Sequence, residues 1–158
     1  MTARVVYLLL LALVASCSQP LTVEQRVIHA IREMEAKIEG GERRAFMEHI
    51  AEDFTAQDGR MNRDQVRALV VFQLNRYERL QGQLFPIAVV ETGPGTATAG
   101  FRALVTGGPG WIPDSGQVFD FETHWRLEGD DWLLASANWK PVPLDQVLDE
   151  LPLPDGGP

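Results

Sequence analysis

The stretch "FDFETHWRLEGDDWLLASANW", residues 119–139, decides the fold. Two runs of alternating residue character flank an acidic turn that contains glycine, which is typical of a β-hairpin. With the turn at Gly129–Asp130, we expect the two strands to pair outward from it without interruption. The facing residues predicted in this way are Trp125 with Leu134, Thr123 with Ser136, and Phe121 with Asn138.

One face of this hairpin is apolar near the turn and becomes polar farther from it. Buried hydroxyl and amide groups need hydrogen-bond partners, so three of them on one face indicate either a pocket that holds water or ligand, or a filled core in which they bond one another. Both alternatives stay open. The candidate pocket residues on this face are Phe121, Thr123, Trp125, Ser136 and Asn138.

The opposite face is mixed in character, with Glu122, His124 and Arg126 on the first strand and Trp139 on the second. It matches neither a clean solvent face nor a clean core. One interpretation is an exposed charged strand with a scattered aromatic residue, which is common. The other, which we favour, is a face through which two copies associate.

The rest of the second half of the chain also has the two-residue period of strands. Its separators are short and rich in glycine, proline or acidic residues, and short connections join antiparallel neighbours. We therefore expect a four-stranded antiparallel meander. Its predicted strands are Leu84–Glu91, Thr96–Thr106, Gln117–Leu127 and Asp131–Lys140.

The first half has the period of helices. Apolar residues recur every three or four positions after Thr22, a suitable N-cap, until Gly40 and Gly41 end the pattern. A second, shorter helix is expected over Glu42–Ala51 and a third over Arg63–Gln81, where Asn62 and Gln65 have capping-box spacing. Three helices followed by a meander predict an α+β fold, with the helices packed on one face of a curved sheet.

The N-terminus has the pattern of a secretory signal. The apolar run Val5–Ala15 would rise about 16 Å as a helix, too little for a bilayer core of about 30 Å. Val14–Cys17 resembles a bacterial lipobox. That resemblance implies a signal peptide over residues 1–16, lipidation with palmitate at Cys17, a tether over 17–22, and an anchor in the outer membrane facing the periplasm. A plain signal with a buried thiol, or an uncleaved anchor, is the alternative.

Composition limits the partners. The formal net charge is −8, so no basic stripe is expected for nucleic acid. The same charge argues against electrostatic adhesion to anionic lipid, so the lipid at Cys17 would hold the protein on a membrane. The sequence has no zinc-ligand spacing, no phosphate-binding loop and no serine nucleophile elbow. We therefore expect no metal and no cofactor. Residues 141–158 are predicted to be a tail, with a possible short helix over Leu144–Leu151.

Three segments, "EGGERRAF", "IAEDFTAQDG" and the closing hairpin, resemble the nuclear transport factor 2-like superfamily over residues 23–140. The resemblance implies a cone-shaped, cystatin-like α+β barrel, shared with ketosteroid isomerases, scytalone dehydratases and cyclases of the SnoaL type. It also implies a tendency to form homodimers through the sheet. The superfamily contains enzymes, ligand binders and interaction modules, so function depends on the site.

A ketosteroid-isomerase-like site would need a carboxylate base, a tyrosine and a protonated acid. The resemblance places these at Asp58, Met34 and Thr123, so only the base has the required chemistry. The three histidines, His29, His49 and His124, are expected on helix or outer-strand surfaces. Two hypotheses remain: an isomerase, dehydratase or cyclase that uses Asp58 as general base, or a non-catalytic module that binds a small apolar ligand or a protein. The departures at Met34 and Thr123 favour the module.

Overall fold

The computed structural model describes residues 20–77, 79–108, 115–143 and 146. The predicted signal peptide, Cys17 and most of the predicted tail lie outside the described residues. Of the expected helix at Leu144–Leu151, only Gln146 is described, in helical conformation. None of the described helices has the length and apolar character needed to cross a membrane.

The helices begin where their capping residues predict. In α2 (Val23–Glu39), the Thr22 hydroxyl accepts a hydrogen bond from the Gln25 backbone, and the Gln25 side chain accepts one in return. Asn62 and Gln65 form the same capping box at the start of α4 (Arg63–Arg76). Between them lies the short α3 (Arg43–Glu48). The buried face of α2 consists of Val27, Ala30, Ile31 and Met34.

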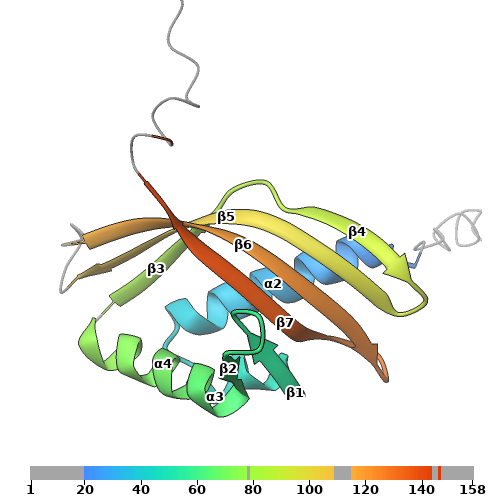
Figure 1. Ribbon diagram of the computed structural model, residues 1–158, viewed down its shortest axis with the longest axis horizontal. Coiled ribbons are helices and arrows are strands. Elements are labelled where there is room, and N and C mark those ends of the chain that lie inside the picture. Colours follow the sequence, from blue (N-terminus) through green and yellow to red (C-terminus); the bar gives the residue numbers. More distant parts are fainter. Residues whose placement is uncertain (1–19, 78, 109–114, 144–145, 147–158) are drawn as a thin grey trace, which may run out of the picture.

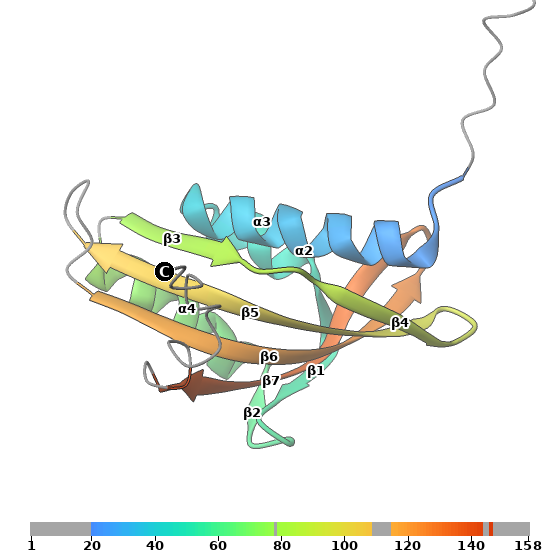
Figure 2. The same ribbon diagram turned by 90° about the horizontal axis from the view of Figure 1, so that it is seen from above.

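The described strands form one curved sheet, and all three helices pack on its concave side (Figures 1 and 2). The α+β prediction is confirmed, but the prediction of four antiparallel strands is wrong, since the described residues form a seven-stranded mixed sheet. The order is β2-β1-β7-β6-β5-β3, and β4 also pairs with β5. The strands are β1 (Ile50–Ala56), β2 (Met61–Asn62), β3 (Arg79–Leu84), β4 (Ala88–Gly93), β5 (Thr96–Gly108), β6 (Ser115–Glu128) and β7 (Asp131–Val142).

Strand β1 is not among the expected strands, because the helix expected over Glu42–Ala51 includes its first two residues. It lies parallel to β7, the last strand, with Ile50 opposite Leu134 and Thr55 opposite Ser136. A parallel pairing between segments so far apart in sequence leaves no local signal. The helical spacing of the apolar residues around Ile50 dominated the local pattern instead.

The expected strand Leu84–Glu91 is in fact the junction of β3 and β4. Both strands pair with β5, and Pro86 separates them because it has no N–H to donate to the ladder. Helix α4 also ends earlier than predicted. Tyr77 leaves it with an extended backbone, and its ring lies so close to Gly107 that an added Cβ there would be 2.6 Å from Tyr77 Cγ.

The closing hairpin has the predicted turn but not the predicted register beyond Trp125. Trp125 faces Leu134, and the next pair is His124 with Ser136, so Ala135 is an extra residue on β7. The Leu134 N–H donates to the His49 carbonyl oxygen at 2.8 Å, which ties the bulge to the segment entering β1. Beyond the bulge every side chain of β7 lies on the face opposite to the predicted one.

Candidate functional site

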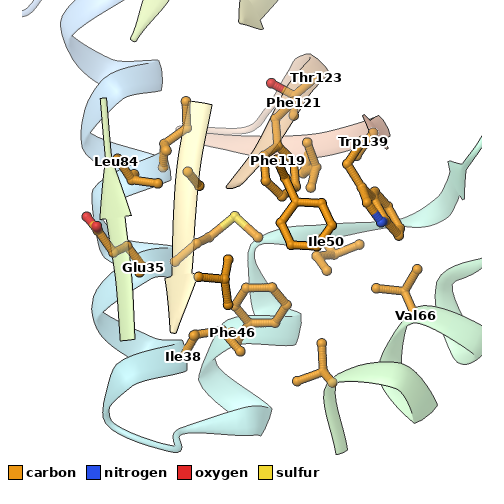
Figure 3. A pocket seen from close by; sticks show the side chains of 18 of the residues that line it. Glu35, Ile38, Phe46, Ile50, Val66, Leu84, Phe119, Phe121, Thr123 and Trp139 are labelled. Atoms are coloured by element: carbon orange, nitrogen blue, oxygen red, sulfur yellow. The ribbon is translucent and has the colours of Figure 1, made fainter. Parts of the chain in front are cut away.

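A cavity of about 320 Å³ lies between the concave face of the sheet and the three helices (Figure 3). Its described lining is apolar except for Glu35, Gln73, Gln81 and Thr123. Exposed Leu69 of α4 and Gln81 of β3 belong to the lining, so the cavity reaches the surface between these two elements. The volume is at the lower end of the range of small-molecule sites.

Thr123, buried at 3% exposure, has its hydroxyl fully used inside the protein. It donates its proton to the Ala99 carbonyl oxygen at 2.8 Å and accepts from Trp125 Nε1 at 2.9 Å. A hydroxyl has one proton, so Thr123 has none left to donate to a ligand in this arrangement. It secures Trp125 in the cavity wall instead.

The other polar lining residues are Glu35, Gln73 and Gln81. Glu35 pairs with Arg32 at 2.9 Å on the surface of α2, and Figure 3 shows its carboxylate directed away from the middle of the cavity. Gln73 Oε1 is buried without a hydrogen-bond partner among the described residues. Glu35 is the single ionisable residue of the described lining.

The predicted pocket residues divide into two groups. Met34, Phe121, Thr123 and Trp125 line the cavity as expected. The placement of Ser136 and Asn138 there was wrong, because the bulge at Ala135 moves both to the outer face and brings Ala137 and Trp139 inward. The prediction that Trp139 lies on the association face was wrong for the same reason.

Sequence reasoning missed part of the aromatic wall. The Phe101 ring stacks on Phe121 at a centroid distance of 5.2 Å, and Phe119 and Trp139 each lie 6.3 Å from Phe121. Alternation along β6 places Phe119 on the same face as Phe121, although Phe119 was not among the candidate pocket residues, and alternation along β5 could have placed Phe101 beside them. The helical contributions of Phe46, Val66 and Val70 need the tertiary structure.

Asp58 lies outside the cavity, in the turn between β1 and β2. It is exposed, and its φ of 57° is stabilised by a reciprocal pair of hydrogen bonds with Asn138: the Asp58 N–H donates to Asn138 Oδ1 at 2.9 Å, and Asn138 Nδ2 donates to Asp58 Oδ1 at 3.0 Å. The hypothesis that Asp58 is a general base toward a ligand in the cavity is therefore not supported by its position.

The outer face of the sheet holds the other predicted association residues. Glu122 and His124 are exposed there. Arg126 reaches across β7 to Asp53 of β1 with two hydrogen bonds of 2.8 and 3.2 Å, and it also bonds Glu128. The hydrogen bond from Arg126 lowers the pKa of Asp53, and those from Asp53 and Glu128 raise the pKa of Arg126. Association through this face stays a prediction.

None of the histidines lines the cavity. His29 is on the exposed face of α2, His49 follows α3, and His124 is on the outer sheet face. Within the described part of the chain, no three histidine, cysteine or acidic side chains come together as metal ligands would.

No family model matches the sequence, and no curated protein matches it either. Solved structures do match. A proposed dehydratase of the NTF2-like family from Streptomyces avermitilis superposes with a TM-score of 0.67 at 19% identity, covering 78% of this chain and 99% of that one. An NTF2-like protein of unknown function from Pseudomonas putida gives 0.64 at 14% identity, covering 88% and 100%. The chain has the nuclear transport factor 2-like fold.

Bd1075 from Bdellovibrio bacteriovorus also carries this fold, with a TM-score of 0.64 and 12% identity over 75% of this chain, which spans 40% of the length of that protein. Other matching structures are described as having a cystatin-like fold. At these identities the nuclear transport factor 2-like fold is what is shared. Activity has to be argued from the cavity.

Proposed function

We propose that the chain is a lipoprotein of the bacterial cell envelope whose nuclear transport factor 2-like domain binds a small apolar ligand without transforming it. The observation that carries this proposal is the apolar cavity of about 320 Å³ with its aromatic wall. A water molecule takes about 30 Å³ in the liquid, so the cavity has room for a ligand of roughly ten non-hydrogen atoms.

The scarcity of ionisable groups in the described lining supports binding over catalysis. General acid–base chemistry needs a titratable group within hydrogen-bond reach of the substrate. Asp58 is exposed outside the cavity, Glu35 is paired with Arg32 and directs its carboxylate away from the middle of the cavity (Figure 3), and the Thr123 proton is donated to Ala99. An isomerase, dehydratase or cyclase with Asp58 as base would need a second cavity beside the turn between β1 and β2.

Tryptophan fluorescence tests ligand binding, because Trp125 and Trp139 both line the cavity. The probes are 1-octanol, decanoate and naphthalene, each close to the size of the cavity. We expect a saturable change in emission with at least one of them. No saturable change with any probe would contradict the proposal.

Two neighbouring residues of α4 provide a matched pair of variants. Val70 lines the cavity and Val71 does not. We expect Val70→Phe to fill part of the cavity and weaken probe binding about tenfold, a loss of about 1.4 kcal/mol. Val71→Phe should bind the probes as the unaltered chain does. If the two variants bound the probes with equal affinity, the probes would have to bind outside this cavity.

The anchor is tested separately from the cavity. Cys17 lies in the lipobox-like segment and is the one cysteine of the chain. Cys17→Ala should abolish labelling with radioactive palmitate and leave an unprocessed precursor. Palmitate labelling that survives this substitution would rule out lipidation at Cys17, whatever the result for the ligand.

A further inference from the structure

The end of the domain formed by α3 and α4 is locally basic, although the chain as a whole has a net charge of −8. These two helices carry five arginines against two acids, a net charge of +3. Arg43, Arg44, Arg63 and Arg67 line a groove of about 500 Å³ between the helices. The arginines are thus concentrated at one surface of an acidic molecule.

Three of these four guanidinium groups can reach an external anion, two of them only by giving up an exposed ion pair. Arg63 is the exception, since it donates to the backbone oxygens of Met47 and Ile50. Arg44 and Arg67 pair with Glu48 and Asp64 at 3.7 and 3.1 Å in exposed positions, where ion pairs contribute little. Arg43 is exposed, and its side chain has no hydrogen bond or ion pair with another described residue.

The same end has an apolar stretch in which Ala68, Leu69 and Phe72 are exposed and Val70 and Val71 are half-buried. Residues 68–72 of α4 are all apolar, and Phe72 and Leu69 are 57% and 36% exposed. A helix on the surface of a soluble domain ordinarily turns polar residues outward. In α4 only Val66 is fully buried, and Leu69 belongs to the cavity lining as well as to the exposed surface. The apolar stretch therefore continues into the mouth of the cavity.

An apolar helix face flanked by arginines fits one occupant in particular. A soluble anion would engage the guanidinium groups but would leave Phe72 in water. A second copy packed on this face by two-fold symmetry would bring arginine against arginine. A bilayer with anionic phospholipids satisfies both features, because its phosphates accept hydrogen bonds from arginine and its interface takes up apolar side chains.

We propose that α4, together with Arg43, Arg44 and Arg67, docks on an anionic phospholipid surface. The cavity mouth beside Leu69 then opens toward the bilayer, from which an apolar ligand can enter. The docking itself is inferred from the arginines and the exposed apolar side chains of this surface. Only the entry of an apolar ligand from the bilayer rests on the proposed function.

Site-specific labelling tests the docking and its orientation. Every described element lies between residues 22 and 142, so the chain from residue 17 onward, with Cys17→Ser, keeps all of them and contains no thiol. Single cysteines at exposed positions, Ala68→Cys on α4 and Glu122→Cys on the outer sheet face, then take one environment-sensitive fluorophore each. The vesicles are phosphatidylglycerol mixed with phosphatidylcholine, or phosphatidylcholine alone.

We expect the label at residue 68 to shift to shorter wavelength with the anionic vesicles and to be quenched by spin-labelled lipid, while the label at residue 122 stays unchanged. Equal responses of the two labels, or none, would overturn the proposal. A shift at residue 68 that appears without vesicles and grows with protein concentration would identify a second copy as the occupant. That result would also overturn the proposal.

Substitutions separate the lipid surface from a free anion. We expect Arg43→Gln and Arg67→Gln each to weaken vesicle binding roughly fivefold, and Phe72→Ser roughly tenfold. Lys140→Gln, an exposed cation on β7, should change nothing. Displacement of the protein from vesicles by millimolar inorganic phosphate, with no effect of Phe72→Ser, would show a soluble-anion site instead. Probe binding, read from tryptophan emission, and vesicle docking, read from the label at residue 68, are separate measurements, so failure of ligand binding and failure of docking are distinguishable.

Discussion

Thr123 shows how one residue can occupy a functional position without a functional role. The family resemblance places it where a ketosteroid isomerase has a protonated acid. In this structure its proton goes to Ala99 and its oxygen accepts from Trp125, both of which are buried. The contribution of Thr123 is therefore to the stability and shape of the cavity wall.

Thr123→Val should lower the free energy of unfolding by about 1–3 kcal/mol, because the Trp125 N–H would be buried without an acceptor. Urea denaturation measures this loss. Thr98→Val is the matched control, since Thr98 is half-buried on the outer face opposite His124, and it should change the value by less than about 0.5 kcal/mol. Equal losses in the two variants would contradict the role assigned to Thr123.

The hydrogen bond between Arg126 and Asp53 makes the folded protein less stable as the pH becomes acidic. The folded-state pKa of Asp53 is lowered by the hydrogen bond from Arg126, so its contribution is fully present above the ordinary carboxyl pKa of about 3.9 and is lost as pH falls through the lower folded-state value. Asp53→Asn should therefore be less stable than the unaltered chain at neutral pH, with the difference disappearing as the pH falls through the folded-state pKa of Asp53. Glu52→Gln, which changes an exposed residue of the same strand, should leave the stability at neutral pH unchanged. A deficit of Asp53→Asn that persists in acid would refute this.

At the scale of elements, a single inserted residue determines which side chains reach the cavity. Alternation along β7 predicts its faces correctly from the turn up to Leu134. The bulge at Ala135 then reverses them, so Trp139 replaces Asn138 on the inner face. Nothing in the sequence around Ala135 marks this position, because the bulge forms where β7 meets β1.

The junction of α4 and β3 depends on a close approach between Tyr77 and Gly107 of β5. Gly107→Ala should cost about 1–3 kcal/mol of stability, because the new Cβ would lie 2.6 Å from Tyr77 Cγ. Gly100→Ala on the same strand is the control, since its Cβ would meet nothing closer than the Phe121 oxygen at 3.9 Å. Denaturation of Gly107→Ala combined with Tyr77→Ala completes the test: the added cost of Gly107→Ala should disappear once the ring is removed.

For the whole molecule, the cavity links ligand binding to stability. A ligand that binds the folded state alone stabilises it by about 2.7 kcal/mol at a concentration of 100 times its Kd. The probe that changes tryptophan emission should therefore raise the melting temperature in a concentration-dependent way, and by less in Val70→Phe. A probe that changes emission but leaves the melting temperature unmoved at saturation would be binding without selectivity for the folded cavity.

The local features of this protein follow from the sequence. The caps at Thr22 and Asn62, the buried face of α2 and the turn at Gly129–Asp130 are confirmed, because each depends on residues within a few positions of one another. Tertiary structure alone decides the parallel pairing of β1 with β7, the bulge at Ala135, the volume left between sheet and helices, and the groove between α3 and α4 that four arginines line. These depend on contacts between distant segments and on space that packing leaves unfilled, and the periodicity of a single element records neither.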